Sequence, residues 1–308
     1  MLFRSLFQRA VLAAQVVGLN IAGMDVVAED ISRPLEEQGG VIIEVNAGPG
    51  LAMHVAPLYG QPQPVGDAIV ELMFPGGEDG RIPIIGIASS AVSASILQIL
   101  AGLLRKLGRR VGLTVGPQVF VDGLRPYSMP ASDRDRVRSL LLHPRVEAAI
   151  FECQVDEALA HGLGCERCDV SVLAGLRTID SASPLGFTVD DVLPLIHAVP
   201  PEGSVVAPAN AADVDRVVSA CRGNVVLYSH EGETPQLREH QTRGGRVAFG
   251  LLDNLVLGSG PNAFFLPLKG LNASSLPPRQ HLLPAVAAAW SAGIPVELLR
   301  AILGRSGC

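Results

Sequence analysis

Three oxygen-bearing side chains near the start of the sequence have the types and spacing of a metal site. Glu44 and Asn46 lie two residues apart in the apolar run VIIEVN (41–46), so on a strand they point to the same face. Asp25 lies in an earlier run, AGMDVVAEDI (22–31), and reaches that face if the two runs pair as a hairpin. Two carboxylates and an amide oxygen suit Mg²⁺ that bridges nucleotide phosphates. A solvated sheet face is the alternative explanation of the same spacing.

A second group of candidate ligands contains cysteines. Cys165 and Cys168 form a CxxC, His161 lies four residues upstream, and Cys153 lies further back. Three thiolates and an imidazole match a tetrahedral zinc set. Cys153, however, ends an apolar run that has the character of a strand, so we do not expect a zinc site. Because the CxxC precedes a strand rather than opening a helix, we do not expect a redox motif either.

Composition excludes several classes of protein. The 308 residues are 48% hydrophobic and 18% charged, with a mean hydropathy of +0.34, which excludes a disordered chain. The net charge of −6 argues against binding to nucleic acid. Five cysteines in a chain of this length are not a disulfide framework, so we predict a cytoplasmic protein.

The longest uncharged stretch does not predict a membrane span. Residues 82–104 carry no charge and are numerous enough to cross a bilayer. They contain four serines and a glutamine. We therefore divide the stretch into a buried strand (82–87), a turn of small residues, and a helix over about 91–107. We predict no membrane partner.

From residue 81 onward, apolar runs alternate with helical patterns, which predicts an α/β fold with a mostly parallel sheet flanked by helices. The expected strands are 82–87, 111–115, 148–153, 169–174, 204–209 and 225–229. The expected helices are 91–107, 133–142, 155–161, 189–198, 211–222, 233–243, 281–293 and 295–303. Residues 246–259 predict a hairpin that turns at Asp253-Asn254. The first 60 residues differ, with a helix near 2–17 followed by the hairpin described above and a short helix over 67–74.

The run GMDVVAEDISRPLEEQGGVIIEVNAGPGLAMHVAP (23–57) closely resembles the end of the ATP-grasp module of cyanophycin synthetases. In that family the Asp, the Glu and the Asn of this pattern are metal ligands, so the resemblance implies that Asp25, Glu44 and Asn46 hold the Mg²⁺ of an ATP site. Such a site also needs an upstream half that binds adenine, and this chain is expected to begin too late to contain it. We therefore assign 1–60 to a C-terminal remnant of the ATP-grasp module and 61–80 to a linker.

Residues 82–304 resemble the second ligase module of the same family, which is similar to the central domain of Mur ligases. That module opens with a GTNGKTTT loop, whose backbone N–H groups and lysine cradle nucleotide phosphates. Here the loop is ASSAVSAS (88–95). The lysine is replaced by Ser93 and the preceding glycine by Val92, so we predict that the loop, with the hydroxyls of Ser89, Ser90, Ser93 and Ser95, does not hold ATP.

Other positions of this module also depart from the family pattern. The glutamate that binds Mg²⁺ in the family is retained as Glu152, which we regard as vestigial. In GLRTIDSAS (175–183), Asp180 is retained but the metal-binding histidine is Ser181. The turn that contacts adenine has become APANAAD (207–213). We assign 81–308 to a Mur-ligase-like central α/β domain and expect no Mur C-terminal domain after it.

The lysine count supports the same interpretation. Only Lys106 and Lys269 are lysines among the 24 basic residues. Neither matches the phosphate-loop lysine or the lysine that is carbamylated in Mur-type ligases. The resemblance implies ATP-dependent ligation of Asp and Arg to a growing peptide, with ATP and Mg²⁺ as cofactors, and we predict that the chain alone does not catalyse it.

Two functional classes remain open at this stage. The chain is the distal subunit of a split ATP-grasp ligase that acts in trans, or it is a pseudoenzyme that serves as a scaffold. The corresponding partners are a second copy in a homo-oligomer, an ATP-grasp half, or an intact synthetase.

Overall fold

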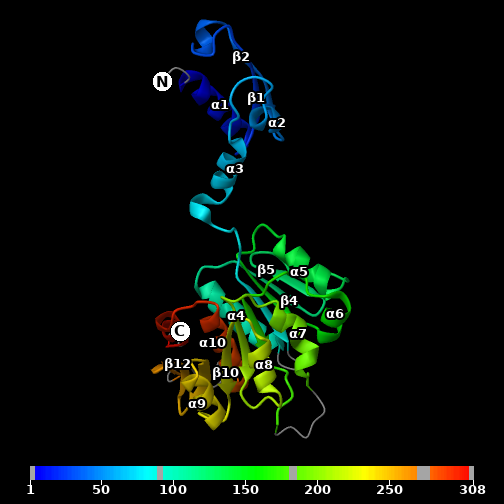
Figure 1. Ribbon diagram of the computed structural model, residues 1–308, viewed down its shortest axis with the longest axis vertical. Coiled ribbons are helices and arrows are strands. Elements are labelled where there is room, and N and C mark those ends of the chain that lie inside the picture. Colours follow the sequence, from blue (N-terminus) through cyan, green and yellow to red (C-terminus); the bar gives the residue numbers. More distant parts are fainter. Residues whose placement is uncertain (1–3, 89–92, 180–185, 269–277, 305–308) are drawn as a thin grey trace. The chain divides into compact units, whose positions relative to one another are not determined.

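The computed structural model describes residues 4–88, 93–179, 186–268 and 278–304. The chain divides into two compact units, Met1–Arg81 and Ile82–Cys308, called unit 1 and unit 2 below (Figure 1). The domain assignment made from the sequence stays a prediction, and each unit is described by itself.

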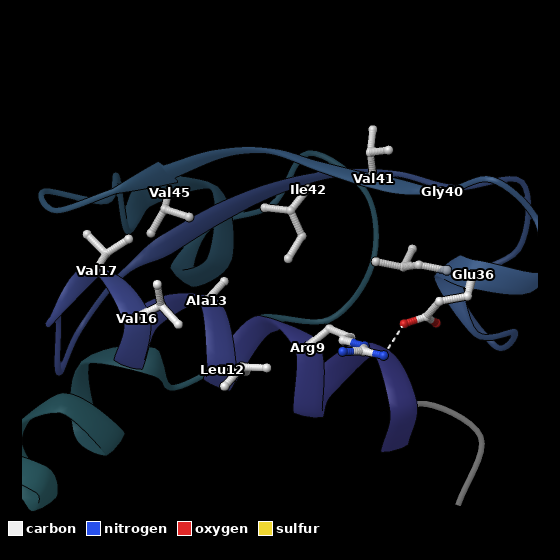
Figure 2. Close-up of a pocket in the computed structure, with 11 residues that line it drawn as sticks. Arg9, Leu12, Ala13, Val16, Val17, Glu36, Gly40, Val41, Ile42 and Val45 are labelled. Atoms are coloured by element: carbon white, nitrogen blue, oxygen red, sulfur yellow. Dashed lines mark ion pairs between the residues drawn. The ribbon is translucent and has the colours of Figure 1, made fainter.

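Unit 1 is built around one helix and one hairpin. The helix α1 (Arg4–Val17) lies along β1 (Gly23–Val27) and β2 (Val41–Asn46), which pair antiparallel (Figure 2). The first strand is shorter than its apolar run suggests, because the Asp30 carboxylate accepts hydrogen bonds from the backbone N–H and the hydroxyl of Ser32 and so starts a turn. The remaining elements are η1 (Leu35–Glu37), α2 (Ala52–Val55), α3 (Val65–Met73) and η2 (Pro75–Gly77).

Unit 2 contains an eleven-stranded sheet within its described residues, with the order β13-β12-β11-β10-β9-β8-β3-β7-β4-β5-β6. The strands from β11 to β4 in this order run parallel, and antiparallel strands extend both edges. The bounds are β3 (Ile84–Ala88), β4 (Val111–Val115), β5 (Gln118–Val121), β6 (Tyr127–Ser128), β7 (Ala148–Glu152), β8 (Val170–Leu173), β9 (Ser204–Pro208), β10 (Asn224–Ser229), β11 (Arg246–Leu251), β12 (Asn254–Ser259) and β13 (Asn262–Pro267). The predicted mostly parallel α/β sheet is confirmed.

Helices cover both faces of this sheet, because parallel strands joined by crossovers must bury both of their faces. One face carries α4 (Ser93–Lys106), α10 (Arg279–Ser291) and α11 (Val296–Gly304). The other carries α5 (Asp133–Leu141), α6 (Val155–His161), α7 (Val189–His197), α8 (Val214–Ala220) and α9 (Pro235–Thr242). All these helices were expected from the sequence, to within a few residues at their ends.

The stretch without charges, residues 82–104, forms β3 and most of α4. Within the described part of the chain, no helix is both long and apolar enough to span a membrane.

The late hairpin turns one residue earlier than the sequence predicts. Leu251 pairs with Asn254, so the two loop residues are Leu252 and Asp253 rather than Asp253 and Asn254. Leu252 adopts a positive φ of 52°, which a two-residue loop requires. Asn tolerates this conformation better than Leu, but the register of β11 and β12 puts Leu252 in the turn and Asn254 in the strand.

Strand β3 occupies the point where the order of the sheet changes direction. It pairs with β7 on one side and with β8 on the other. Its own crossover leads through α4 to β4, whereas the later strands extend the sheet from β8. In open α/β sheets, ligands bind beyond the carboxyl ends of the strands at this kind of switch point. The fold therefore predicts that a ligand of unit 2 would bind beyond the carboxyl end of β3.

The packing around β3 leaves no room for a side chain at Gly86. A Cβ atom there would lie 2.7 Å from Leu195 Cδ1 and 2.8 Å from Phe151 Cζ. Both neighbours are themselves buried in the core, so neither can move far. Gly86 is therefore a close-packing position rather than a flexible one.

We expect Gly86→Ala to lower the free energy of unfolding of unit 2 by about 1–3 kcal/mol through overpacking. The control is Gly102→Ala within α4, where a Cβ meets no atom within 4 Å. That substitution is expected to stabilise by about 0.5–1 kcal/mol, since Gly disfavours a helix interior. Urea unfolding followed by circular dichroism measures both, and shifts of the same sign would contradict the packing described.

Candidate functional site

The carboxyl edge of the sheet brings together the ends of several strands of unit 2. β3 ends at the buried Ala88, and Ile87 pairs with Glu152 at the end of the neighbouring β7. The backbone of Gly175, after β8, donates to Ala88 O at 3.2 Å. Glu152 is therefore the carboxylate placed next to the end of β3, at the switch point of the sheet.

Most of the predicted phosphate-loop residues cannot be placed. Ser89 and Ser90 lie outside the described residues, as does the side chain of Ser93, whose backbone begins α4. Ser95 is half-buried on the first turn of that helix. The prediction that this loop does not hold phosphate therefore stays a prediction.

The Glu152 carboxylate is held by the backbone of a neighbouring turn. It accepts a hydrogen bond of 2.8 Å from the N–H of Gly116, which follows β4 and has a φ of 49°. This bond ties the end of β7 to the turn between β4 and β5. The inherited Mg²⁺ role of Glu152 stays a prediction, and the structure adds that this carboxylate also bridges two strand ends.

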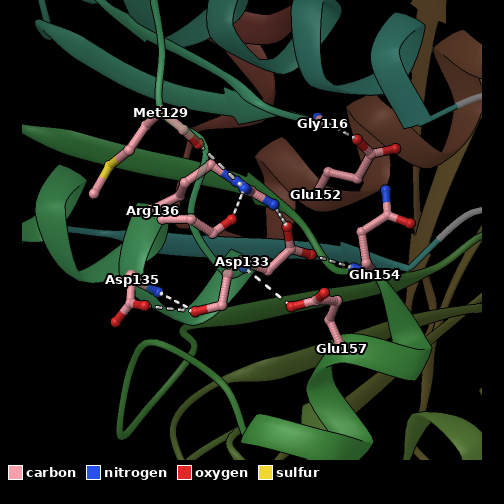
Figure 3. A network of polar contacts seen from close by, with 10 residues as sticks. Gly116, Met129, Asp133, Asp135, Arg136, Glu152, Gln154 and Glu157 are labelled. Atoms are coloured by element: carbon pink, nitrogen blue, oxygen red, sulfur yellow. Dashed lines mark hydrogen bonds and ion pairs between the residues drawn. The ribbon is translucent and has the colours of Figure 1, made fainter.

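A polar network fixes the segment that follows Glu152 (Figure 3). The Asp133 carboxylate pairs with the guanidinium of Arg136 and accepts a hydrogen bond of 3.0 Å from the N–H of Gln154. The guanidinium of Arg136 also donates to the carbonyl oxygens of Ala131 and Met129. Arg136 is only 9% exposed, so the network anchors the start of α5 against the end of β7 in a poorly solvated environment.

The sequence indicated only part of this network. Ser132 caps α5, because its side chain accepts a hydrogen bond from the N–H of Asp135, and a serine before a helix is a cap that the sequence can indicate. The spacing of Asp133 and Arg136 allows an ion pair within one helix, but nothing in the sequence shows that the pair is buried or that it reaches Gln154.

Two segments that were compared above with the family pattern, GLRTI (175–179) and APANAAD (207–213), lie side by side. Thr178 forms a bridge with Ala211, Ile179 N donates to Asn210 O at 2.9 Å, and Ala212 N donates to Arg177 O at 2.9 Å. The structure thus joins GLRTI to the APANAAD turn near the carboxyl end of β9. Asp180 and Ser181 lie outside the described residues.

The two cysteines of the CxxC are neighbours whose thiol pKa values are shifted in opposite directions. Hydrogen bonding to Cys168 lowers the pKa of the half-exposed Cys165 thiol, whereas burial raises the pKa of Cys168. Burial, with Asp133 nearby, raises the pKa of Cys153 to about 12. Among the described residues, no three His, Cys, Asp or Glu side chains are grouped to hold a metal ion, and Cys153 and Cys168 pack in the hydrophobic core.

In unit 1, the hairpin places the three predicted ligands on one face. Asp25 pairs directly with Glu44, and Asn46 pairs with Gly23 on the same face two residues away. Both carboxylates are exposed. Within the described residues, neither has an ion-pair partner, although like charges directly opposite on a sheet repel each other. A divalent cation would relieve this repulsion, and the three oxygen donors suit Mg²⁺.

Gly23, which pairs with Asn46 on the hairpin, has no side chain that could crowd the three oxygen donors. A Cβ at Gly23 would approach Pro49 Cβ to 2.9 Å and Asn46 Cβ to 3.7 Å. The glycine therefore leaves space beside the Asn46 side chain. The donor set fits a hard cation, and the role of these residues as ligands stays a prediction.

Cyanophycin synthetases are similar to this chain in sequence. No family model matches the chain. The cyanophycin synthetase of Synechocystis sp. is 34% identical over 245 residues, which cover 76% of this chain and 27% of that protein. That of Geminocystis herdmanii is 30% identical over 306 residues, which cover 93% of this chain and 34% of that protein. The chain thus spans about a quarter to a third of the length of these relatives.

A solved structure supports the fold of unit 2. The structure of UDP-N-acetylmuramoyl-L-alanyl-D-glutamate–2,6-diaminopimelate ligase matches with a TM-score of 0.53 and 15% identity, covering 73% of this chain and 46% of that one. This similarity confirms the predicted Mur-ligase-like fold and says nothing further about activity.

We expect Arg136→Met to lower the free energy of unfolding by about 3–5 kcal/mol, because it removes a buried guanidinium and leaves the largely buried carboxylate of Asp133 without its cation. The control is Arg243→Met, which removes an exposed pair with Glu239 and is expected to change stability little. Urea unfolding measures the free energy of unfolding of both variants. Equal losses would show that the buried network contributes no more to stability than an exposed ion pair does. Adding Asp133→Asn to Arg136→Met is expected to cost less than the sum of the single changes.

We expect Cys165 to react with iodoacetamide at pH 8 before any other described cysteine, because its lowered pKa gives it the largest thiolate fraction. Cys221 is the matched control, since it is also half-exposed but burial raises its pKa. Peptide mass spectrometry over a time course gives the order, and faster labelling of Cys221 or Cys153 would contradict the described environments.

Proposed function

Because the chain is a cyanophycin synthetase-like protein that carries a Mur-ligase-like α/β unit, we propose that this unit does not bind ATP and that the chain by itself does not catalyse peptide ligation. The reaction implied by the family begins when a carboxylate oxygen takes the γ-phosphoryl group of ATP, giving an acyl phosphate and ADP. An amine then attacks the carbonyl carbon, phosphate leaves, and an amide bond forms. Both steps require the phosphates to be held in a fixed position.

The observation that carries the proposal is the replacement of the phosphate-loop lysine by Ser93. A serine hydroxyl supplies no positive charge to phosphate, and Val92 resists the backbone conformations that a glycine adopts there. Among the described residues, no lysine is within reach of the loop. Lys106 lies in the last turn of α4, 13 residues beyond Ser93 and therefore about 20 Å along the helix axis. Lys269 lies outside the described residues.

The opposed carboxylates in unit 1 favour a second candidate function. Asp25, Glu44 and Asn46 retain the donor set of an ATP-grasp metal site even though the phosphate loop of unit 2 has lost its lysine. Mg²⁺ held there would neutralise the phosphate oxygens of ATP. We propose that unit 1 supplies these ligands to an ATP-grasp half on another polypeptide, so that the chain is the distal part of a ligase that acts in trans. A scaffold role without catalysis is the alternative if no such half restores activity.

We expect isothermal titration of the purified chain with ATP and Mg²⁺ to give no dissociation constant tighter than about 1 mM. The matched variant carries Val92→Gly and Ser93→Lys, which restore the glycine and the lysine of the loop, and is expected to bind at least about tenfold more tightly. Binding of ATP near micromolar by the natural chain, or phosphate release on adding Asp, Arg and ATP, would refute the first proposal.

We expect Glu44→Gln to reduce Mg²⁺-dependent ligation at least about tenfold when the chain is combined with an ATP-grasp half. The control is Glu37→Gln, at the exposed end of η1, which is expected to leave the rate unchanged. Phosphate release measured across a range of Mg²⁺ concentrations also separates a metal ligand from a structural residue, because the loss of a ligand raises the Mg²⁺ concentration needed for half-maximal rate. An unchanged Mg²⁺ dependence would exclude Glu44 as a ligand.

A further inference from the structure

The loop between α6 and β8 carries two cysteines whose side chains meet. Cys165 and Cys168 are three residues apart, and the backbone between them bends. Their side chains are hydrogen-bond partners, so the two sulfur atoms are neighbours in the folded chain. A spacing of three residues across a bend is compatible with the short Cα separation that a disulfide requires.

Packing against α5 fixes the segment that leads into Cys165. A Cβ atom at Gly164 would lie 2.4 Å from the carbonyl oxygen of Arg134 and 2.6 Å from Val137 Cβ, so the backbone of this loop touches the helix. The guanidinium of Arg134 also donates a hydrogen bond of 3.1 Å to the carbonyl oxygen of His161, at the end of α6. The chain therefore reaches Cys165 from an anchored position.

The segment that begins at Cys168 is anchored to β3 and α7. The N–H of Cys168 donates to the carbonyl oxygen of Ala198 at 2.8 Å. Its Sγ atom lies 3.1 Å from the position that a Cβ of Gly86 would occupy, so this thiol packs against β3. The next carboxylate, Asp169, accepts a hydrogen bond of 2.8 Å from the N–H of Ile84. Because the fold holds both ends of the bend, each thiol has a high effective concentration for the other.

The two thiols differ in access and in protonation. Cys165 is partly exposed, whereas Cys168 is buried in the core. Hydrogen bonding to Cys168 lowers the pKa of Cys165, which increases its thiolate fraction, and burial raises the pKa of Cys168. A reachable nucleophile thus lies beside a protonated thiol, which is the arrangement of oxidation-sensitive cysteines that have a resolving partner.

The position of the CxxC excludes one kind of redox chemistry. The sequence argued against a redox motif because the CxxC precedes a strand, and the structure agrees, since α6 ends at His161 and β8 begins at Val170. No helix N-terminus is therefore available to lower the pKa of the first cysteine as a helix dipole does. An internal disulfide needs no such helix, because it requires only that the two sulfur atoms can meet.

We propose that Cys165 and Cys168 form a reversible intramolecular disulfide when the protein meets a hydroperoxide. With hydrogen peroxide, the Cys165 thiolate sulfur attacks one peroxide oxygen and the O–O bond breaks. A sulfenic acid forms on Cys165, and the hydroxide released takes up the proton that the thiol had lost. The Cys168 sulfur then attacks the Cys165 sulfur, the S–O bond breaks, and the proton of Cys168 leaves with that hydroxide as water.

The balance of this reaction is two thiols and one hydrogen peroxide to one disulfide and two molecules of water. The two sulfur atoms lose two electrons together, and the peroxide gains them. The disulfide would join Cys165, whose segment packs on α5, to Cys168, which packs on β3. Oxidation therefore acts beside the strand at the switch point of the sheet, and it does not depend on whether unit 2 binds ATP.

The test is peptide mapping of the full chain after reduction, removal of the reductant, and exposure to hydrogen peroxide at about pH 8. Remaining thiols are alkylated before digestion. Trypsin cleaves this part of the chain after Arg145, Arg167 and Arg177. Cys153 and Cys165 therefore share peptide 146–167, whereas Cys168 lies on peptide 168–177. We expect a disulfide that links these two peptides and that dithiothreitol cleaves.

Three variants assign the bond. Cys153→Ala is the matched control, since Cys153 is on the same peptide and near Cys165, and the linked peptides are expected to form as in the natural chain. Cys165→Ser is expected to reduce them at least about tenfold, because it removes the attacking thiolate. Cys168→Ser is expected to leave a sulfenic acid on Cys165 that dimedone traps and that excess peroxide converts to sulfinic acid.

Three results would overturn the proposal. Cys165 of the natural chain becomes sulfinic acid while no linked peptides form, peptide 146–167 carries an internal disulfide to Cys153 instead, or Cys165→Ser gives as much linked product as the natural chain. The first two results come from the natural chain, so they hold even where a substitution impairs folding. Circular dichroism of each variant verifies that the sheet of unit 2 is present.

Discussion

The pairing of β3 with β7 on one side and β8 on the other is the constraint on which unit 2 depends. It sets the switch point of the sheet and determines which strand ends meet at the carboxyl edge. The close packing at Gly86 keeps β3 in place between the two layers of helices. The bond from Gly116 to Glu152 and the network around Asp133 then connect the neighbouring strand ends to that edge. The strand ends that meet at the switch point are thus held together by packing and by hydrogen bonds.

The two units contrast in what they retain. Unit 2 has a large buried core around strands that are covered on both faces, and it has Ser93 where the family resemblance implies a phosphate-loop lysine. Unit 1 retains three oxygen donors on one face of a hairpin and has almost no core. Hydrophobic burial is the main stabilising contribution to folding, so most of that contribution among the described residues comes from unit 2. The proposed metal ligands and the main hydrophobic core therefore lie in different units of the chain.

Periodicity allowed most elements to be predicted, because buried parallel strands are continuous apolar runs and the helices carry one apolar stripe. The alternation of the two predicted the parallel α/β sheet. The edge strands β5, β6 and β13 were not predicted, since short strands that pair on one side have no distinctive pattern. The turn at Leu252 was misplaced because pairing across the whole hairpin, rather than the preference of one residue, decides the register.

By itself, the sequence determined the fold class, the spacing of Glu44 and Asn46, and the absence of a lysine at Ser93, since each depends on local pattern or on residue identity alone. Only the tertiary structure decided that Asp25 lies directly opposite Glu44, because the register of two separate strands sets that pairing. It also decided that Arg136 is buried against Asp133, and that α1 is left exposed despite its apolar composition. Burial depends on which surfaces meet in space, and a linear sequence does not contain that information in any local pattern.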